Sequence, residues 1–244
     1  MAKPIPWLRV LVEGATIVGS ILLAFGIEAW WADRSAVDRE QRLLVALSAE
    51  FEQNDELLQE ARAAYERTYM DAVRILELVE GGAAEIDEAE FERLLRGLLW
   101  NRTFHLESGA HDALLASGDL DLIRDEELRN RLAAWPSYVA EWSEEERAVH
   151  SFVKDVLVPH VSGYTRLRSV ARPFPPFPDG EAPSFRIPSG SSESASLSVL
   201  ATSVEFDNLV YRRALGTWHA MRDGETLRAQ LSRILSLIRR NVDQ

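Results

Sequence analysis

Residues 7–31 read WLRVLVEGATIVGSILLAFGIEAWW, and this stretch governs how the rest of the chain is interpreted. Residues 14–27 carry no charge, and Trp7 and the pair Trp30–Trp31 bracket them, as interfacial aromatic residues bracket a membrane helix. At about 1.5 Å per residue, the helix from Trp7 to Trp30 is roughly 35 Å long, enough to cross a hydrocarbon core of about 30 Å. The stretch therefore predicts a transmembrane helix over residues 7–32.

Two glutamates lie towards the ends of this predicted span. Glu13 and Glu28 fall near the two membrane interfaces, where a carboxylate costs much less than at the bilayer centre. A cleaved signal peptide is the weaker interpretation, because bulky Trp30 and Trp31 follow the apolar run where a small-x-small cleavage site would be needed. We therefore expect an uncleaved anchor whose interface residues are Trp7, Trp30, Trp31, Glu13 and Glu28.

One side of the predicted span carries small residues. Ala15, Gly19 and Gly26 fall within about 40° of one another at about 100° per residue. Such a stripe lets another helix approach closely. Two interpretations stay open: small residues that are ordinary content of a membrane helix, or a contact face for a second copy or a membrane-protein partner.

Composition limits the classes of function. The chain has 244 residues, a net charge of −12 and no cysteine. Disulfides, cysteine-ligated metals and thiol catalysis are thereby excluded, and the acidic charge argues against a nucleic-acid partner. The lipid bilayer is the first partner that the sequence predicts.

The orientation of the span is nearly balanced by the positive-inside rule. Lys3 and Arg9 precede the apolar run, and Arg34, Arg39 and Arg42 follow it. The short tail and the acidic bulk of the chain favour a tail inside and a main domain outside the cytoplasm.

Beyond the span, the periodicity is helical throughout. Apolar residues from Leu43 to Val79 recur mostly at steps of three and four, which predicts an amphipathic helix continuous with the span and ending at Gly81–Gly82. Asn54 interrupts this stripe, either as a buried residue that fixes register or as a solvent-facing one. Asp87 and Asp125 are predicted N-caps of later helices.

The whole chain is predicted to be all-α, an antiparallel helical bundle completed near the C-terminus. Gly224 is expected to separate a helix over 203–223 from the last helix. Six of the ten prolines and a serine run indicate a long loop in the middle of the chain. The predicted organisation is a tail at 1–6, the span at 7–32, a first part of the bundle at 33–171, the loop at 172–198 and the closing helices at 199–244.

Three blocks carry a resemblance to a known group of proteins. They are GATIVGSILLAFGIEAWWADR, LLVALSAEFEQN at residues 43–54, and TFHLESGAHDALLASGDLDLIRDEELRNRL at residues 103–132. They resemble an uncharacterised bacterial family, a domain of unknown function with one N-terminal membrane helix. The resemblance implies a single-pass bacterial protein, with the inner membrane favoured; it brings no activity, substrate or catalytic residue.

Motifs for chemistry are lacking, so no catalytic, cofactor-binding or metal-binding residue is predicted. The pairs Glu107–His111 and Glu146–His150 have helical spacing but are typical of surface pairs. An acidic cluster, Asp119, Asp121, Asp125 and Glu127, does not have the spacing of a calcium loop.

Three hypotheses for function follow from the sequence. The first is a membrane-anchored interaction or scaffold protein. The second is an extracytoplasmic ligand-sensing domain acting through a membrane partner. The third, an enzyme, is the least favoured. The pocket of a sensing domain would lie among five aromatic residues: Trp100, Phe104, Trp135, Tyr138 and Trp142.

Overall fold

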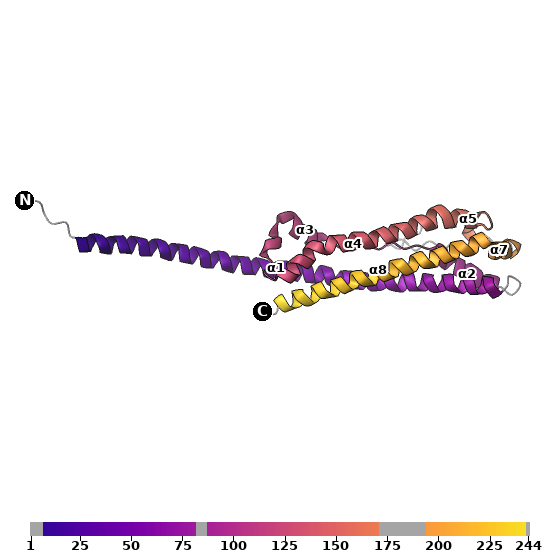
Figure 1. Ribbon diagram of the computed structural model, residues 1–244, viewed down its shortest axis with the longest axis horizontal. Helices are drawn as coiled ribbons and strands as arrows, with labels where there is room; N and C mark the ends of the chain where they lie inside the picture. Colours follow the sequence, from indigo (N-terminus) through magenta and orange to yellow (C-terminus); the bar gives the residue numbers. More distant parts are fainter. Residues whose placement is uncertain (1–6, 82–86, 171–193, 243–244) are drawn as a thin grey trace, which may run out of the picture. The chain divides into compact units, whose positions relative to one another are not determined.

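The structure is a computed structural model that describes residues 7–81, 87–170 and 194–242 (Figure 1). These residues form helices and connections with no strand, so the predicted all-α class is confirmed. Most of the predicted Pro/Ser-rich loop lies outside the described residues, and its last residues, 194–198, are already helical. The elements are α1 (Trp7–Gly81), α2 (Glu88–Leu99), α3 (Gly109–Ser117), η2 (Asp119–Leu122), α4 (Glu126–Phe152), η3 (Val153–Leu157), α5 (Val158–Ser162), α6 (Leu167–Val170), α7 (Ser194–Ala201) and α8 (Val204–Val242).

Helix α1 contains 75 residues without interruption. The prediction that the apolar segment continues directly into an amphipathic helix is therefore confirmed, and the helix ends at Gly81 as expected. The predicted N-caps are also confirmed: Asp87 accepts a hydrogen bond from Ala89 N at 3.1 Å, and Asp125 accepts one from Leu128 N at 3.0 Å.

The described chain divides into two compact units. The first unit comprises Met1–Glu50, Ser108–Ala133 and Ser236–Gln244. Its core lies where α3, η2 and the beginning of α4 cover α1, together with the end of α8. The buried apolar residues there include Leu44, Leu47, Leu114, Ile123, Leu128, Leu132, Leu237 and Ile238.

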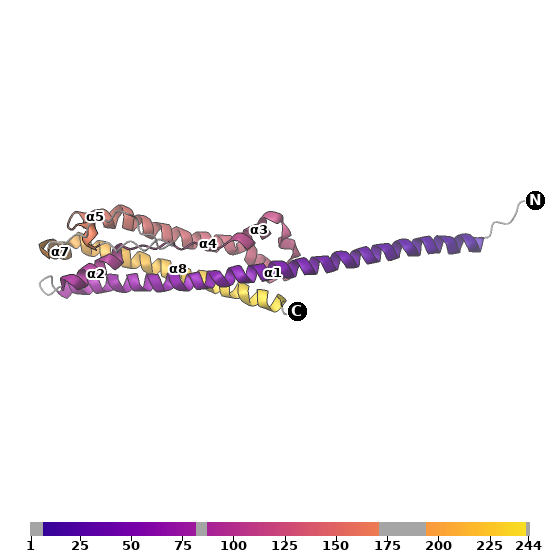
Figure 2. The same ribbon diagram turned by 180° about the vertical axis from the view of Figure 1, so that it is seen from behind.

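The second unit comprises Phe51–Glu107 and Ala134–Leu235. Within it, α1 and α4 run in the same direction, since Phe51 meets Trp135 with ring centroids 5.0 Å apart and Tyr65 meets Glu146 further along both helices. Helix α8 runs the opposite way, and the three lie side by side in Figures 1 and 2. One end is filled by a core that includes Ile75, Phe91, Leu94, Leu157, Val161, Leu200, Phe206 and Val210.

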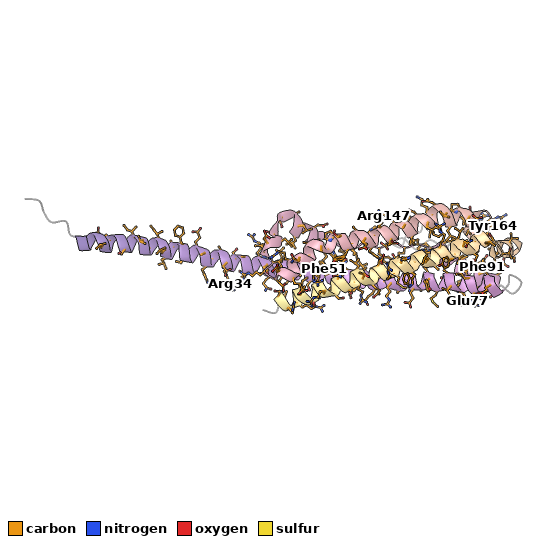
Figure 3. All side chains as sticks on the ribbon, viewed as in Figure 1. Arg34, Phe51, Glu77, Phe91, Arg147 and Tyr164 are labelled. Carbon is orange, nitrogen blue, oxygen red and sulfur yellow. The ribbon has the colours of Figure 1, made fainter. Side chains whose placement is uncertain are left out.

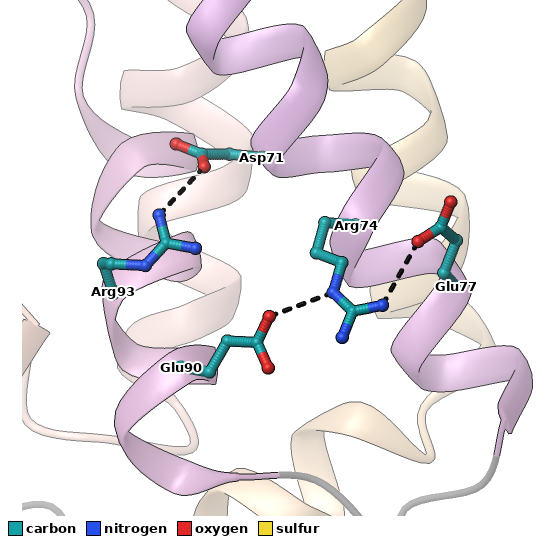
Figure 4. Close-up of polar contacts among 5 residues, drawn as sticks. All are labelled: Asp71, Arg74, Glu77, Glu90 and Arg93. Carbon is teal, nitrogen blue, oxygen red and sulfur yellow. Dashed lines mark hydrogen bonds and ion pairs between the residues drawn. The ribbon is translucent and has the colours of Figure 1, made fainter.

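Helix α2 folds back along α1, and ion pairs connect the two helices. Arg74 Nε lies 2.9 Å from Glu90 Oε1, and Arg93 Nη1 lies 3.3 Å from Asp71 Oδ1 (Figure 4). Arg74 also reaches Glu77 on its own helix at 3.3 Å. The order of the pairs, 71 with 93 and 74 with 90, shows that the two helices are antiparallel.

The predicted break at Gly224 is wrong, because α8 is continuous from Val204 to Val242. A glycine inside a helix costs about 1 kcal/mol relative to alanine, so its presence needs another reason. A Cβ at Gly224 would lie 3.2 Å from Trp142 Nε1, tighter than ordinary van der Waals contact. Gly224 therefore lets α8 pass closely over the Trp142 ring of α4.

Pro136 lies inside α4 and does not end it. The helix continues to Phe152, and the chain goes on through a π-helical turn, η3, and then α5 to Ser162. The helical path thus runs without a break from Glu126 to Ser162.

Candidate functional site

The first candidate region is the N-terminal part of α1, where the predicted interface residues lie. Its apolar side chains are exposed: Trp30 and Trp31 are each 64% exposed and pack edge to face, with ring centroids 6.1 Å apart. Helix α1 is long and apolar enough to cross a membrane, and none of its apolar window is buried (Figure 3). Glu13 and Glu28 are also exposed on this helix. The Trp7 side chain lies outside the described residues.

The small-residue side of this segment is open. An added Cβ at Gly19 or Gly26 would meet no heavy atom within 4 Å, and Ala15 is exposed. Within the described chain, this side of α1 is thus available for another helix.

In the first unit, two carboxylates of α1 hold the main chain of the segment that follows residue 108. Glu50 accepts hydrogen bonds from Ala110 N at 2.5 Å and from His111 N at 3.2 Å. These N–H groups begin α3 and have no partner within their own helix, so Glu50 caps α3 from another helix. Glu40, 7% exposed, accepts from Arg124 N at 2.8 Å.

In the second unit, Asn54 is fully buried, although the sequence alone allowed either a buried or a solvent-facing position. Its Nδ2 donates to Glu107 O at 2.8 Å, and Glu107 N donates to its Oδ1 at 2.7 Å. Asn54 therefore satisfies both main-chain groups of one residue in the connection before α3. Of the two alternatives, the buried position is therefore correct and the solvent-facing one is wrong.

A buried ionisable pair joins α1 to α4 in the second unit. Tyr65 is 5% exposed and its hydroxyl donates to the carboxylate of Glu146, which is 7% exposed. Burial raises the pKa of Tyr65, and the negative charge of Glu146 raises it further. Burial also raises the pKa of Glu146, partly offset by its hydrogen bonds from Tyr65 and from Phe104 N.

Arg213 of α8 is the largest buried cation of this unit, only 1% exposed. Its Nε donates to Leu98 O and its Nη2 to Trp100 O, both at 3.1 Å. Nη1 donates to Thr217 Oγ1 at 3.1 Å, and Nη2 also reaches the side-chain oxygen of Asn101 at 3.4 Å. The guanidinium thus binds carbonyls at the C-terminal end of α2, where a helix favours positive charge. Burial lowers the pKa of Arg213 to about 10.

A cleft of about 830 Å³ opens beside these groups in the second unit. It lies along α1, α2 and the connection after α2. Gly97 lets the two helices come close, because a Cβ there would overlap the carboxylate of Asp71. The lining residues are Ala63, Ala64, Tyr65, Glu66, Arg67, Thr68, Met70, Asp71, Arg93, Arg96, Gly97, Trp100, Asn101, Arg102 and Arg213.

The five aromatic residues proposed as a sensing pocket are not gathered around this cleft. Trp135 packs on Phe51 and is 3% exposed, and Phe104 packs on Tyr65 with centroids 6.0 Å apart. Tyr138 and Trp142 line a separate space of about 30 Å³, near the volume of a single water molecule. Of the five, only Trp100 lines the cleft.

The candidate metal ligands remain apart. Among the described residues, no group of three or more His, Asp or Glu side chains could hold a metal ion. His111 is buried and its Nε2 donates to Leu132 O at 2.8 Å, whereas His150 accepts from Asn101 Nδ2 through Nδ1. In the acidic cluster, Asp125 caps α4, Asp119 pairs with Arg39 at 3.7 Å, and Glu127 pairs with Arg131 at 3.1 Å.

Hydrophobicity alone does not identify Arg213 as a buried residue of α8. Leu215 and Trp218 of the same helix are 42% and 39% exposed, whereas Arg213 and Thr217 are buried. The available signal was the i,i+4 spacing of Arg213 and Thr217 within the run from Leu209 to Ala220. Arginines in such a run, here Arg212 and Arg213, are ordinarily assigned to the solvent side of the helix.

No protein-family model, curated protein or solved structure matches this chain, so its function is inferred from its own residues and contacts.

Proposed function

We propose that this chain is a single-pass membrane protein whose helical units act as an interaction or scaffold module. One observation carries the proposal: the apolar side chains of α1 that the structure describes between Leu11 and Trp31 are all exposed. Its large side chains are between 49% and 68% exposed at Leu11, Ile17, Val18, Ile21, Leu22, Leu23, Phe25 and Ile27. Each such side chain gains about 1.5–3 kcal/mol on full transfer from water to an apolar medium, so hydrocarbon is the environment that suits the segment.

An interaction role is favoured over catalysis because the polar groups found so far are used by the fold. Glu40, Glu50 and Asn54 bind main-chain groups, and the buried Tyr65 hydroxyl is bound to Glu146. These contacts order the chain without leaving a nucleophile beside a base. The proposed partner is a second copy that meets the small-residue face of α1, with another membrane protein as the alternative occupant.

We also propose that the chain belongs to the bacterial family that its three blocks resemble. Its location would then be the inner membrane, with the soluble units outside the cytoplasm. The near balance of basic residues makes orientation the part of this proposal that most needs a direct measurement.

Membrane insertion is tested by alkaline extraction of membranes from expressing cells. We expect the full chain to stay in the pellet and to dissolve only in detergent. The double variant Leu22→Arg/Phe25→Arg should lose retention, because each arginine at a helix centre costs about 2.5–3.5 kcal/mol of insertion free energy. Val204→Arg is the matched control, since Val204 is 76% exposed but lies in α8. Recovery of the unaltered chain in the supernatant without detergent would refute the anchor.

Self-association is tested by single-cysteine cross-linking, which has no background because the chain lacks cysteine. Gly19→Cys lies on the small-residue face, and Ile21→Cys lies on the opposite side of the helix, about 200° away. Under mild oxidation in membranes, a dimer is expected with the first variant and little with the second. Equal dimer yields, or none, would exclude a second copy on this face.

Orientation is tested with Ser137→Cys on the exposed side of α4. A membrane-impermeant maleimide should label it in intact spheroplasts. Labelling that requires lysis would place the units in the cytoplasm and refute the proposed orientation.

The ligand-sensing hypothesis is the second candidate function. It draws support from a single observation, the arginine-lined cleft, which differs from the aromatic pocket first considered.

A further inference from the structure

The charge that lines the cleft of the second unit is opposite in sign to that of the whole protein. The chain carries a net charge of −12, yet the cleft wall holds five arginines and only two carboxylates, Glu66 and Asp71. Asp71 is paired with Arg93 at 3.3 Å, which neutralises one of the two (Figure 4). A local excess of guanidinium groups in an acidic protein indicates attraction of an anion.

The guanidinium groups of Arg93 and Arg96 are held in place by contacts that leave donors unused. Arg96 Nε donates to Val170 O at 3.1 Å, and the guanidinium makes no further bond to a described residue. Arg93 is oriented by Asp71, and Arg67 is exposed at the cleft without an ion pair to any residue that the structure describes. Arginine presents donors in a planar fork that matches carboxylate and phosphate oxygens, and a fork already fixed by a neighbour loses less entropy on binding.

Buried Arg213 adds a fixed positive charge behind the wall. Its hydrogen bonds go to two main-chain carbonyls, a hydroxyl and an amide oxygen, and it has no ion pair within the described part of the chain. The charge is therefore solvated by dipoles and is not cancelled. An anion in the cleft would be attracted by this charge through a medium less polarisable than water.

The remaining wall is apolar and partly aromatic. Trp100 is 42% exposed and Met70 is 58% exposed, and both line the cleft with Ala63 and Ala64. Exposed tryptophan and methionine next to arginines suit a ligand that carries a ring or a short apolar body beside its charged group. The volume of about 830 Å³ lies within the range of small-molecule sites.

We propose that this cleft binds a small organic anion, a carboxylate or phosphate ester attached to an aromatic or apolar body. Arg67, Arg93 and Arg96 face the anionic group, and Trp100 contacts the body. The proposal goes beyond the membrane anchor and stands whether or not α1 crosses a bilayer. The same headgroup chemistry occurs in free metabolites and in acidic lipids, and the experiment distinguishes the two.

The probe is phenyl phosphate, and Trp100 is the reporter. The full chain is studied in neutral detergent, and the emission of Trp100 is taken as the difference between the unaltered chain and Trp100→Phe. We expect saturable protection of Trp100 from iodide quenching by phenyl phosphate, and a rise in the unfolding temperature that follows the same saturation curve. Benzyl alcohol, which has the ring without the charge, should give neither effect at the same concentrations.

The double variant Arg67→Gln/Arg93→Gln should weaken the apparent affinity for phenyl phosphate at least tenfold. Both side chains are exposed and Arg67 has no ion pair to a described residue, so only the exposed Arg93–Asp71 pair is lost and the unfolding temperature without ligand should fall by no more than a few degrees. Arg147→Gln, on the outer side of α4 (Figure 3), removes one such positive charge away from the cleft and should leave the affinity unchanged. A comparable loss with Arg147→Gln or equal binding of benzyl alcohol would overturn the proposal. So would a lack of saturation at about 10 mM phenyl phosphate, tenfold above a millimolar dissociation constant.

The source of the anion is distinguished in nanodiscs. If the ligand is a free metabolite, phenyl phosphate protects Trp100 equally in neutral discs and in discs that contain phosphatidic acid. If phosphatidic acid alone protects Trp100 and phenyl phosphate adds nothing further, the anion is a lipid headgroup and the free-metabolite form of the proposal is wrong.

Discussion

Replacing Arg213 with methionine tests whether the buried guanidinium stabilises the second unit. The substitution keeps the length and apolar stem of the side chain and removes the guanidinium. Leu98 O and Trp100 O then lose their donor at the C-terminal end of α2. A buried acceptor left unsatisfied costs about 1–3 kcal/mol, so the two together cost about 2–6 kcal/mol. Relief from burying a charge offsets part of this, and we expect a net loss of about 3 kcal/mol.

The measurement is thermal unfolding of the full chain in detergent, followed by the emission of the buried tryptophans. For a domain of this size about 3 kcal/mol corresponds to a fall of roughly 6–12 °C in the unfolding temperature. Arg212→Met is the matched control, since Arg212 is exposed with its guanidinium 4.7 Å from the Phe152 ring centroid. Its loss should stay below about 1 kcal/mol. Equal effects of the two substitutions would refute a structural role for the buried guanidinium.

Three further substitutions probe other contacts. Asn54→Asp places a carboxylate oxygen against Glu107 O and should cost about 2–4 kcal/mol by the same melt; a loss below about 1 kcal/mol would contradict the reciprocal bond. Gly224→Val puts a branched side chain where a Cβ already lies 3.2 Å from Trp142 Nε1, and should cost about 1–3 kcal/mol, whereas an unchanged melt would mean that the two helices separate freely. Burial raises the pKa of Glu146, so this carboxyl group binds a proton more readily in the folded chain than in the unfolded chain. The unaltered chain should therefore lose stability relative to Glu146→Gln as the pH rises above the ordinary carboxyl pKa. A stability difference that does not change with pH would refute this.

The local features of this fold could be predicted because each depends on a few consecutive residues. Asp87 and Asp125 cap their helices through main-chain groups two or three residues away. Gly118 closes α3 with a φ of 74°, a conformation that glycine adopts without steric cost. The apolar periodicity up to Val79 likewise predicted α1, since its interruption at Asn54 does not require a break in the helix.

The contacts that form the cleft could not be predicted in this way. Arg213 binds carbonyls more than a hundred positions earlier in the chain, and the rotation of α8 that buries it exposes Trp218 instead. A helical wheel ranks residues by hydrophobicity, so it turns a lone arginine outward. Only the unsatisfied end of α2 supplies a reason to turn it inward. The role of Gly224 could not be predicted for the same reason, because it depends on the Trp142 ring of another helix.

The two blocks at residues 43–54 and 103–132, on which the family resemblance largely rests, are related by contact as well as by order. Glu50 and Asn54 of the first block bind main-chain groups at positions 107, 110 and 111 of the second. Because the bonds end on the main chain, they require a carboxylate and an amide in the first block but no particular side chain at those positions of the second. The role of Glu50 and Asn54 is thus to order the connection before α3 and to cap the first turn of that helix. The arginines of the cleft lie outside both blocks. Substitutions at these arginines could therefore change the specificity of the cleft for a ligand without disturbing the contacts of Glu50 and Asn54.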